Sequence, residues 1–205
     1  MMGEPRHLRT DMMQSDARSG ELLDAVLADV ARVGESVGSV TSNGLRTMRR
    51  HGRAIGRENC RSLDSISDAL ARDVARLTNA ATEIVETEER IAEVERASIE
   101  AGTGPLTHGS PDWVALVAKA RALENANASV TRNMDMLTDI EARIDDATAP
   151  TGKGVPDEMA ATWAETKDET RRARGESSKL KDDIEAWERQ RGLARGFMFG
   201  SVGTR

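Results

Sequence analysis

Aromatic residues are nearly missing from this chain of 205 residues, which has no tyrosine, three tryptophans and two phenylalanines. Aromatic rings bury the largest area per residue, so their scarcity argues against a thick globular core. Hydrophobic residues make up 38% and charged residues 31%, against roughly 45–50% (counting glycine) and about 25% in an ordinary globular domain. The composition therefore favours long helices that share a thin core of leucine, isoleucine, valine and alanine.

Cysteine is almost absent as well, and no long apolar run occurs. The single cysteine, Cys60, excludes an intramolecular disulfide framework and fits a reducing compartment. No stretch approaches 18 apolar residues, so the sequence predicts no transmembrane segment. The opening "MMGEPRHLRTDMM" lacks the apolar core of a signal peptide. We therefore expect a cytoplasmic or nuclear protein that is not secreted.

The first part of the chain predicts one short helix. Residues 1–19 show no periodicity and are expected to form a disordered N-terminus. Residues 20–44 predict a short heptad helix, because valines recur at intervals of three and four. Gly34 and Gly38 weaken this helix, and a break or hinge is expected from Thr41 to Gly44.

Two longer segments carry the clearest heptads. Residues 45–101 predict a long helix that a loop at 102–110 ends, and residues 111–147 predict the next helix. In both segments apolar residues recur every seven positions, and we call each such row a seam. The seams are Leu63, Leu70, Leu77, Ile84 and Ile91, followed by Leu116, Leu123, Val130, Leu137 and Ile144.

A linker at 148–156 precedes a last predicted helix at 157–192. Loops of about ten residues between helices of similar length predict antiparallel neighbours. The fold is thus expected to be all-α, an elongated antiparallel helical hairpin or coiled-coil bundle of three long helices plus a shorter N-terminal helix. Trp187 would then lie near the level of Trp113, and Trp163 near Ile140. The first and last helices have weak seams, so we expect partner chains to complete them.

No pattern in the sequence indicates catalysis, a cofactor or a metal. His7, His51 and His108 each lack a histidine or cysteine neighbour at i+3 or i+4, and Cys60 has no evident base. The stretches "GTG" (residues 102–104) and "GKG" (residues 152–154) do not extend into a phosphate-binding loop. We therefore expect no enzymatic activity, no cofactor and no small-molecule substrate.

An arginine stripe at the start of the long helix is the main candidate binding site. On one continuous helix its residues would fall within about one third of the circumference. They are Arg46, Arg49, Arg50, Arg53, Arg57 and Arg61. Such a stripe can grip phosphates of nucleic acid or of an acidic membrane. Alternatively it pairs with acidic helices of this chain or of a partner, since residues 62–100 hold ten acidic residues against four arginines.

Both phenylalanines, Phe197 and Phe199, lie in residues 193–205, which predict a flexible tail. Flanking glycines separate them from the seams, so they are expected either to dock into a partner's pocket or to be passive. The whole sequence favours a non-catalytic coiled-coil subunit of a multiprotein complex, of tethering, cytoskeletal, kinetochore or nuclear-pore type. Its partners would be other coiled-coil subunits, in a homo- or hetero-oligomer.

Three alternatives remain open at this point. The first is a helical binding module whose arginine stripe engages nucleic acid or acidic membrane. The second is a viral or phage structural component. The third is a self-contained four-helix bundle that binds nothing through its seams.

Overall fold

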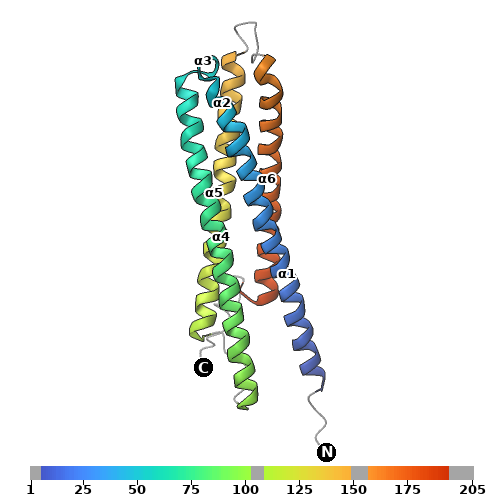
Figure 1. Cartoon of the computed structure of the whole chain (residues 1–205). Helices are drawn as coiled ribbons and strands as arrows, with labels where there is room; N and C mark the ends of the chain where they lie inside the picture. The colour runs from blue at the N-terminus through green and yellow to red at the C-terminus, as the bar shows by residue number, and fades with distance from the viewer. Residues whose placement is uncertain (1–5, 103–108, 149–156, 194–205) are drawn as a thin grey trace, which may run out of the picture.

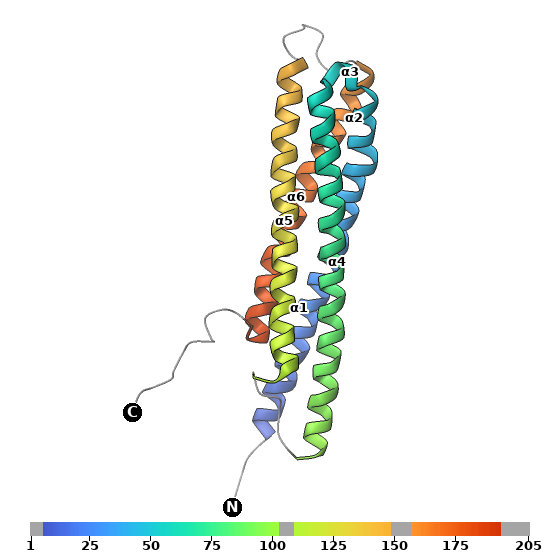
Figure 2. The same ribbon diagram turned by 90° about the vertical axis from the view of Figure 1, so that its left-hand side faces the viewer.

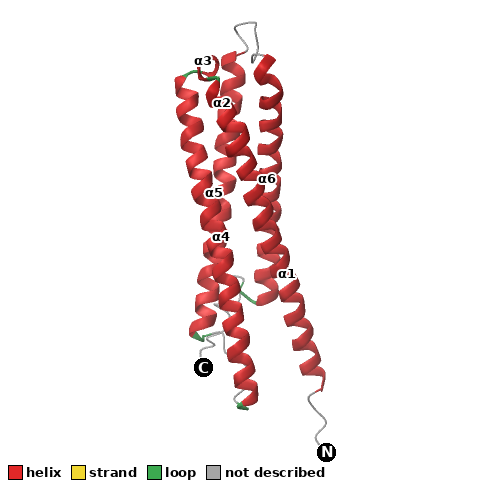
Figure 3. Ribbon diagram, in the orientation of Figure 1, coloured by secondary structure: helices red, strands yellow, loops and turns green. Residues whose placement is uncertain are grey.

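The computed structural model describes residues 6–102, 109–148 and 157–193, and almost all of them are helical. No strand occurs in these ranges, which confirms the predicted all-α class (Figure 3). In chain order the elements are α1 (Arg6–Ser39), the π-helix η1 (Val40–Leu45), α2 (Arg46–Arg50), α3 (Gly52–Ile55), α4 (Arg57–Glu100), α5 (Pro111–Thr148) and α6 (Asp157–Arg191).

The four long helices lie side by side as an elongated bundle (Figure 1). Each one packs on two neighbours, in the ring order α1, α4, α5, α6, and neighbours run antiparallel (Figure 2). Between α4 and α5, Lys119 Nζ lies 2.9 Å from Glu83 Oε2, and Asn133 Nδ2 donates to an Asp73 carboxylate oxygen over 2.6 Å. These contacts pair late α4 with early α5, which confirms the predicted antiparallel arrangement.

The core follows the two long seams. All ten of their residues are at most 1% exposed, and burying each such side chain contributes about 1.5–3 kcal/mol. Val94 and Ile99 near the end of α4 are instead exposed. At that end α1 and α4 extend past α5 and α6, so fewer helices cover them (Figures 1 and 2).

The first and last helices complete each other, which corrects the expectation that their seams need partner chains. Val26, Val33 and Val37 on α1 are buried, as are Ala173 and Leu180 on α6, and the two helices pack together.

The polar part of the α6 seam is buried with its hydrogen bonds satisfied, as burial of such groups requires. Thr170 Oγ1 donates to Glu141 at 2.8 Å, and Ser177 Oγ donates to Asn127 Oδ1 at 2.8 Å. The sequence prediction underestimated how much of this seam is buried. Threonine and serine are unfavourable in a core unless acceptors for their hydroxyl groups are present.

The start of α1 differs from the sequence prediction. Helix begins at Arg6, whereas residues 1–19 were expected to be disordered and residues 20–44 to form a short helix. Backbone hydrogen bonds in a helix are local, so a segment without an apolar repeat still continues a helix where no proline interrupts it. The N-terminal helix therefore has 34 residues, close to the 35 of α6.

The expected break at Thr41–Gly44 is also wrong. Helix continues there as the π-helix η1, and Gly44 serves close packing, because a Cβ added at Gly44 would lie 2.5 Å from Thr166 Cγ2 on α6. The chain instead turns at His51 and at Gly56. The long helix predicted for residues 45–101 is consequently three helices, with α4 starting at Arg57.

The tryptophans show how α6 lies against α5. The Arg191 guanidinium lies 5.1 Å from the centroid of the Trp113 ring, so the end of α6 returns to the start of α5, as expected for Trp187. Trp163 Nε1 donates to Asp145 Oδ1 over 2.7 Å. Trp163 therefore lies about one helical turn further along α5 than its predicted level at Ile140.

Candidate functional site

The turn between α1 and α4 lies at one end of the bundle (Figure 1), and this turn and the start of α4 carry the six arginines of the predicted stripe. Leu45, Met48 and Ile55 are at most 1% exposed and anchor this turn in the core. Four of the arginines lie between these anchors, two follow Ile55, and all six are exposed. Gly56 has φ 86°, a backbone conformation that glycine adopts without a steric penalty, and it redirects the chain into α4.

The arginines do not form one stripe on one helix, which corrects the sequence prediction. Arg46, Arg49 and Arg50 belong to α2, Arg53 belongs to α3, and the last two belong to α4. The arginine side chains therefore point in directions that are set by the axis of the helix to which each belongs. The bend at Gly56 brings arginines from both of its sides to the same part of the surface.

Four arginines line a single hollow with a volume of about 610 Å³. Two come from α2 and α3, before the bend, and two come from α4, after it. No acidic side chain and no large apolar side chain belongs to the lining. The complete lining is Arg50, Gly52, Arg53, Gly56, Arg57, Cys60 and Arg61. We call this feature the arginine hollow.

Most of these arginines have no acidic partner in the described part of the chain. Arg49 forms an ion pair with Asp64 on α4. The other five arginines form none with the described residues. Pairing with this chain's own acidic helices therefore accounts for Arg49 alone.

The other three lining residues of the hollow are Gly52, Gly56 and Cys60. A Cβ added at Gly52 would approach Cys60 Sγ to 2.9 Å, so a larger residue at this position would require the Cys60 side chain to shift. Cys60 is half-buried and free. No side chain caps the first turn of α4, and the Asn59 amide instead donates to the Ile55 carbonyl over 2.8 Å.

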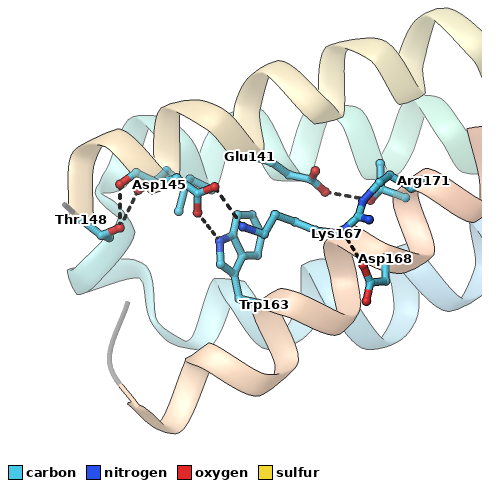
Figure 4. Close-up of polar contacts among 9 residues, drawn as sticks. Glu141, Asp145, Thr148, Trp163, Lys167, Asp168 and Arg171 are labelled. Atoms are coloured by element: carbon cyan, nitrogen blue, oxygen red, sulfur yellow. Dashed lines mark hydrogen bonds and ion pairs between the residues drawn. The ribbon is translucent and has the colours of Figure 1, made fainter. Parts of the chain in front are cut away.

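A second polar group lies where α5 packs on α6 (Figure 4). Asp145 accepts hydrogen bonds from Trp163 Nε1 at 2.7 Å and from Lys167 Nζ at 3.0 Å. Lys167 Nζ also lies 5.6 Å from the centroid of the Trp163 ring. These contacts tie the start of α6 to the end of α5.

Glu141 is the buried acid of this group. Burial raises the pKa of Glu141 to about 7 from the ordinary 4.5, while the hydrogen bond from Thr170 and the charge of Lys167 act in the opposite direction. Sequence reasoning missed this residue, because a single glutamate in a helical pattern looks like part of the solvated face.

Phe197 and Phe199 lie outside the described residues. Among the described residues no cluster of histidine, cysteine, aspartate or glutamate is suited to hold a metal ion. Within the same ranges, no helix has an apolar stretch that could cross a membrane. Comparison with protein-family models, with curated proteins and with solved structures gave no match.

Proposed function

We propose that this protein is a non-catalytic interaction subunit, a helical rod that helps to hold a multiprotein complex together through its arginine end. The buried seams support this view of the rod, because the apolar residues that could have wound with other chains already pack inside one chain. Partners therefore dock on the outside of the bundle. In a reducing compartment, the cytoplasm or nucleus, Cys60 would remain a free thiol.

The observation that carries the proposal is the set of exposed arginines that have no acidic partner among the described residues. Residues 45–61 hold six arginines against one glutamate. The rest of the chain holds 23 basic against 34 acidic side chains, a balance of −11. A local basic surface on an acidic rod attracts and orients an acidic partner, and it does so at one end only.

A second candidate function uses the same arginines on the phosphates of nucleic acid or of an acidic membrane. Five arginines lack an acidic partner in the part of the chain that the structure describes, and this favours the second function equally. The acidic balance of the rest of the chain disfavours a long nucleic acid, which would run along the rod and meet repulsion there.

Capture of partners from the native source tests the proposal. The full chain, tagged, is compared with a variant that carries Arg50→Glu and Arg57→Glu, and recovered proteins are quantified by mass spectrometry. A matched control carries Arg72→Glu and Arg121→Glu, which change the same charge at exposed positions on the sides of α4 and α5.

We expect a stoichiometric partner to be recovered with the parent chain and with the control, and lost with the arginine-end variant. Circular dichroism should give the same helix content for all three proteins, because every substituted side chain is exposed. Equal recovery with all three would contradict docking through the arginine end.

A further inference from the structure

We propose that the arginine hollow binds a compact cluster of phosphate groups, as in a short polyphosphate or a multiply phosphorylated headgroup. This inference deepens the proposed function and rests on it in one respect, that the arginine end is a binding surface. It adds the chemical class of the ligand.

The first support is the convergence of four guanidinium groups on one hollow. Arg50 and Arg53 approach it from before the bend at Gly56, and Arg57 and Arg61 approach it from α4. Each guanidinium carries five N–H donors in a planar fork that matches phosphate oxygens in a bidentate geometry. No carboxylate belongs to the lining, so no internal acceptor competes for these donors.

The backbone of the hollow is open to a ligand. Gly52 and Gly56 contribute no side chain to its wall, and a side chain at Gly52 would have to displace Cys60. The first turn of α4 beside Gly56 has no side-chain cap. Its amide groups and the positive end of this long helix add to the attraction that the arginines provide.

Size and charge select a compact ligand. A volume of about 610 Å³ lies within the range of roughly 300–1,000 Å³ of small-molecule sites. A short polyphosphate concentrates several negative charges within such a space. The balance of −11 outside residues 45–61 repels a polyanion that extends along the rod. Phosphate monoesters and anhydrides therefore fit better than a nucleic acid duplex.

Titration calorimetry of the full chain with inorganic tripolyphosphate, near physiological salt, tests the inference. We expect one ligand per chain. Arg50→Ala and Arg57→Ala should each weaken binding about tenfold, since each removes charge-assisted hydrogen bonds. Arg72→Ala is the matched control and should bind like the parent chain. All three substitutions replace an exposed helical arginine by alanine, a better helix former, so the fold is kept.

Citrate, a tricarboxylate of similar size, is the chemical control, and we expect it to bind at least about tenfold more weakly than tripolyphosphate. Three results would overturn the inference: no binding of tripolyphosphate, equal binding by parent and hollow variants, or equal binding of citrate. Tighter binding of a duplex DNA than of tripolyphosphate would also overturn it and indicate nucleic acid instead, if the salt dependence of the DNA affinity is steeper than four phosphate contacts predict.

Two further arms identify the source of the phosphates. Vesicles that contain phosphatidylinositol bisphosphate are compared with soluble inositol phosphates. Arginine-dependent binding of both supports the phosphate-cluster site, and binding of vesicles alone supports it with a membrane source. If partner capture depends on the arginine end but tripolyphosphate does not bind, the phosphate inference fails and the proposed function stands. If tripolyphosphate binds and capture is unaffected by the variants, the phosphate inference stands and the proposed function fails.

Discussion

Replacing Glu141 by glutamine should make the protein more stable at neutral and alkaline pH. The Glu141 side chain is buried between α5 and α6, and burial raises its pKa to about 7 from 4.5. In the folded chain the carboxyl therefore holds its proton at a pH where the unfolded chain has lost it. Glutamine resembles the protonated acid, and its carbonyl can still accept the hydrogen bond from Thr170.

The magnitude follows from the shift in pKa. Each unit corresponds to about 1.4 kcal/mol, so the ionised form of Glu141 costs the fold about 3 kcal/mol at most. Because the folded pKa is raised, the native state binds more protons than the unfolded state between the two pKa values. The Glu141 carboxyl therefore makes its full contribution to the stability of the parent chain below about pH 4.5. This contribution is lost as the pH rises through about 7. The glutamine variant should not show that loss.

The assay is urea unfolding followed by far-ultraviolet circular dichroism at several pH values. At about pH 8 the Glu141→Gln variant should exceed the parent by up to about 3 kcal/mol, and at about pH 4 the two should agree. Glu86→Gln, on an exposed part of α4, removes the same charge and should change stability by less than about 0.5 kcal/mol. A variant that is no more stable than the parent at about pH 8 would refute the reasoning.

Two other predictions concern the bundle. Gly44→Ala should destabilise the fold by about 1–3 kcal/mol in the same urea assay, because its new Cβ meets Thr166. Gly38→Ala, which meets nothing, should stabilise by about 0.5–1 kcal/mol, and equal effects of the two would contradict the close packing of η1 on α6. In a cysteine-free background, cysteines at Glu83 and Lys119 should form a disulfide much faster than cysteines at Glu83 and Arg143. Faster pairing of the second set would exclude the antiparallel order of α4 and α5.

The long helices could be predicted from sequence because their signal is local and repetitive. Apolar residues every seven positions, such as Leu63 and Leu70 in one row, define a face that must be buried whatever covers it. Loop lengths then indicate antiparallel neighbours. The ring of four helices was harder to predict from the sequence. Burial of Thr170 and Ser177 is acceptable only because Glu141 and Asn127 accept their hydrogen bonds.

The arginine hollow illustrates a different limit. The sequence showed the six arginines but placed them on one helix, since no proline interrupts residues 6–104. Their convergence depends on the backbone at His51 and Gly56, and no sequence pattern favours a bend there over the one expected near Gly44. Two glycines four residues apart, Gly52 and Gly56, were the available signal. Each also occupies a position that a larger side chain would fill.

A closed core and an unneutralised arginine end are consistent with each other energetically. Two guanidinium groups about 10 Å apart in water repel by about 0.4 kcal/mol, and salt reduces this further. Four of them at one hollow therefore cost the fold only a few kcal/mol, about as much as one or two buried leucines contribute. The ten seam residues, all buried within one chain, offset this cost without help from a partner. The same repulsion is relieved when a compact anion enters the hollow, so the closed bundle can keep its arginine end free until a ligand arrives.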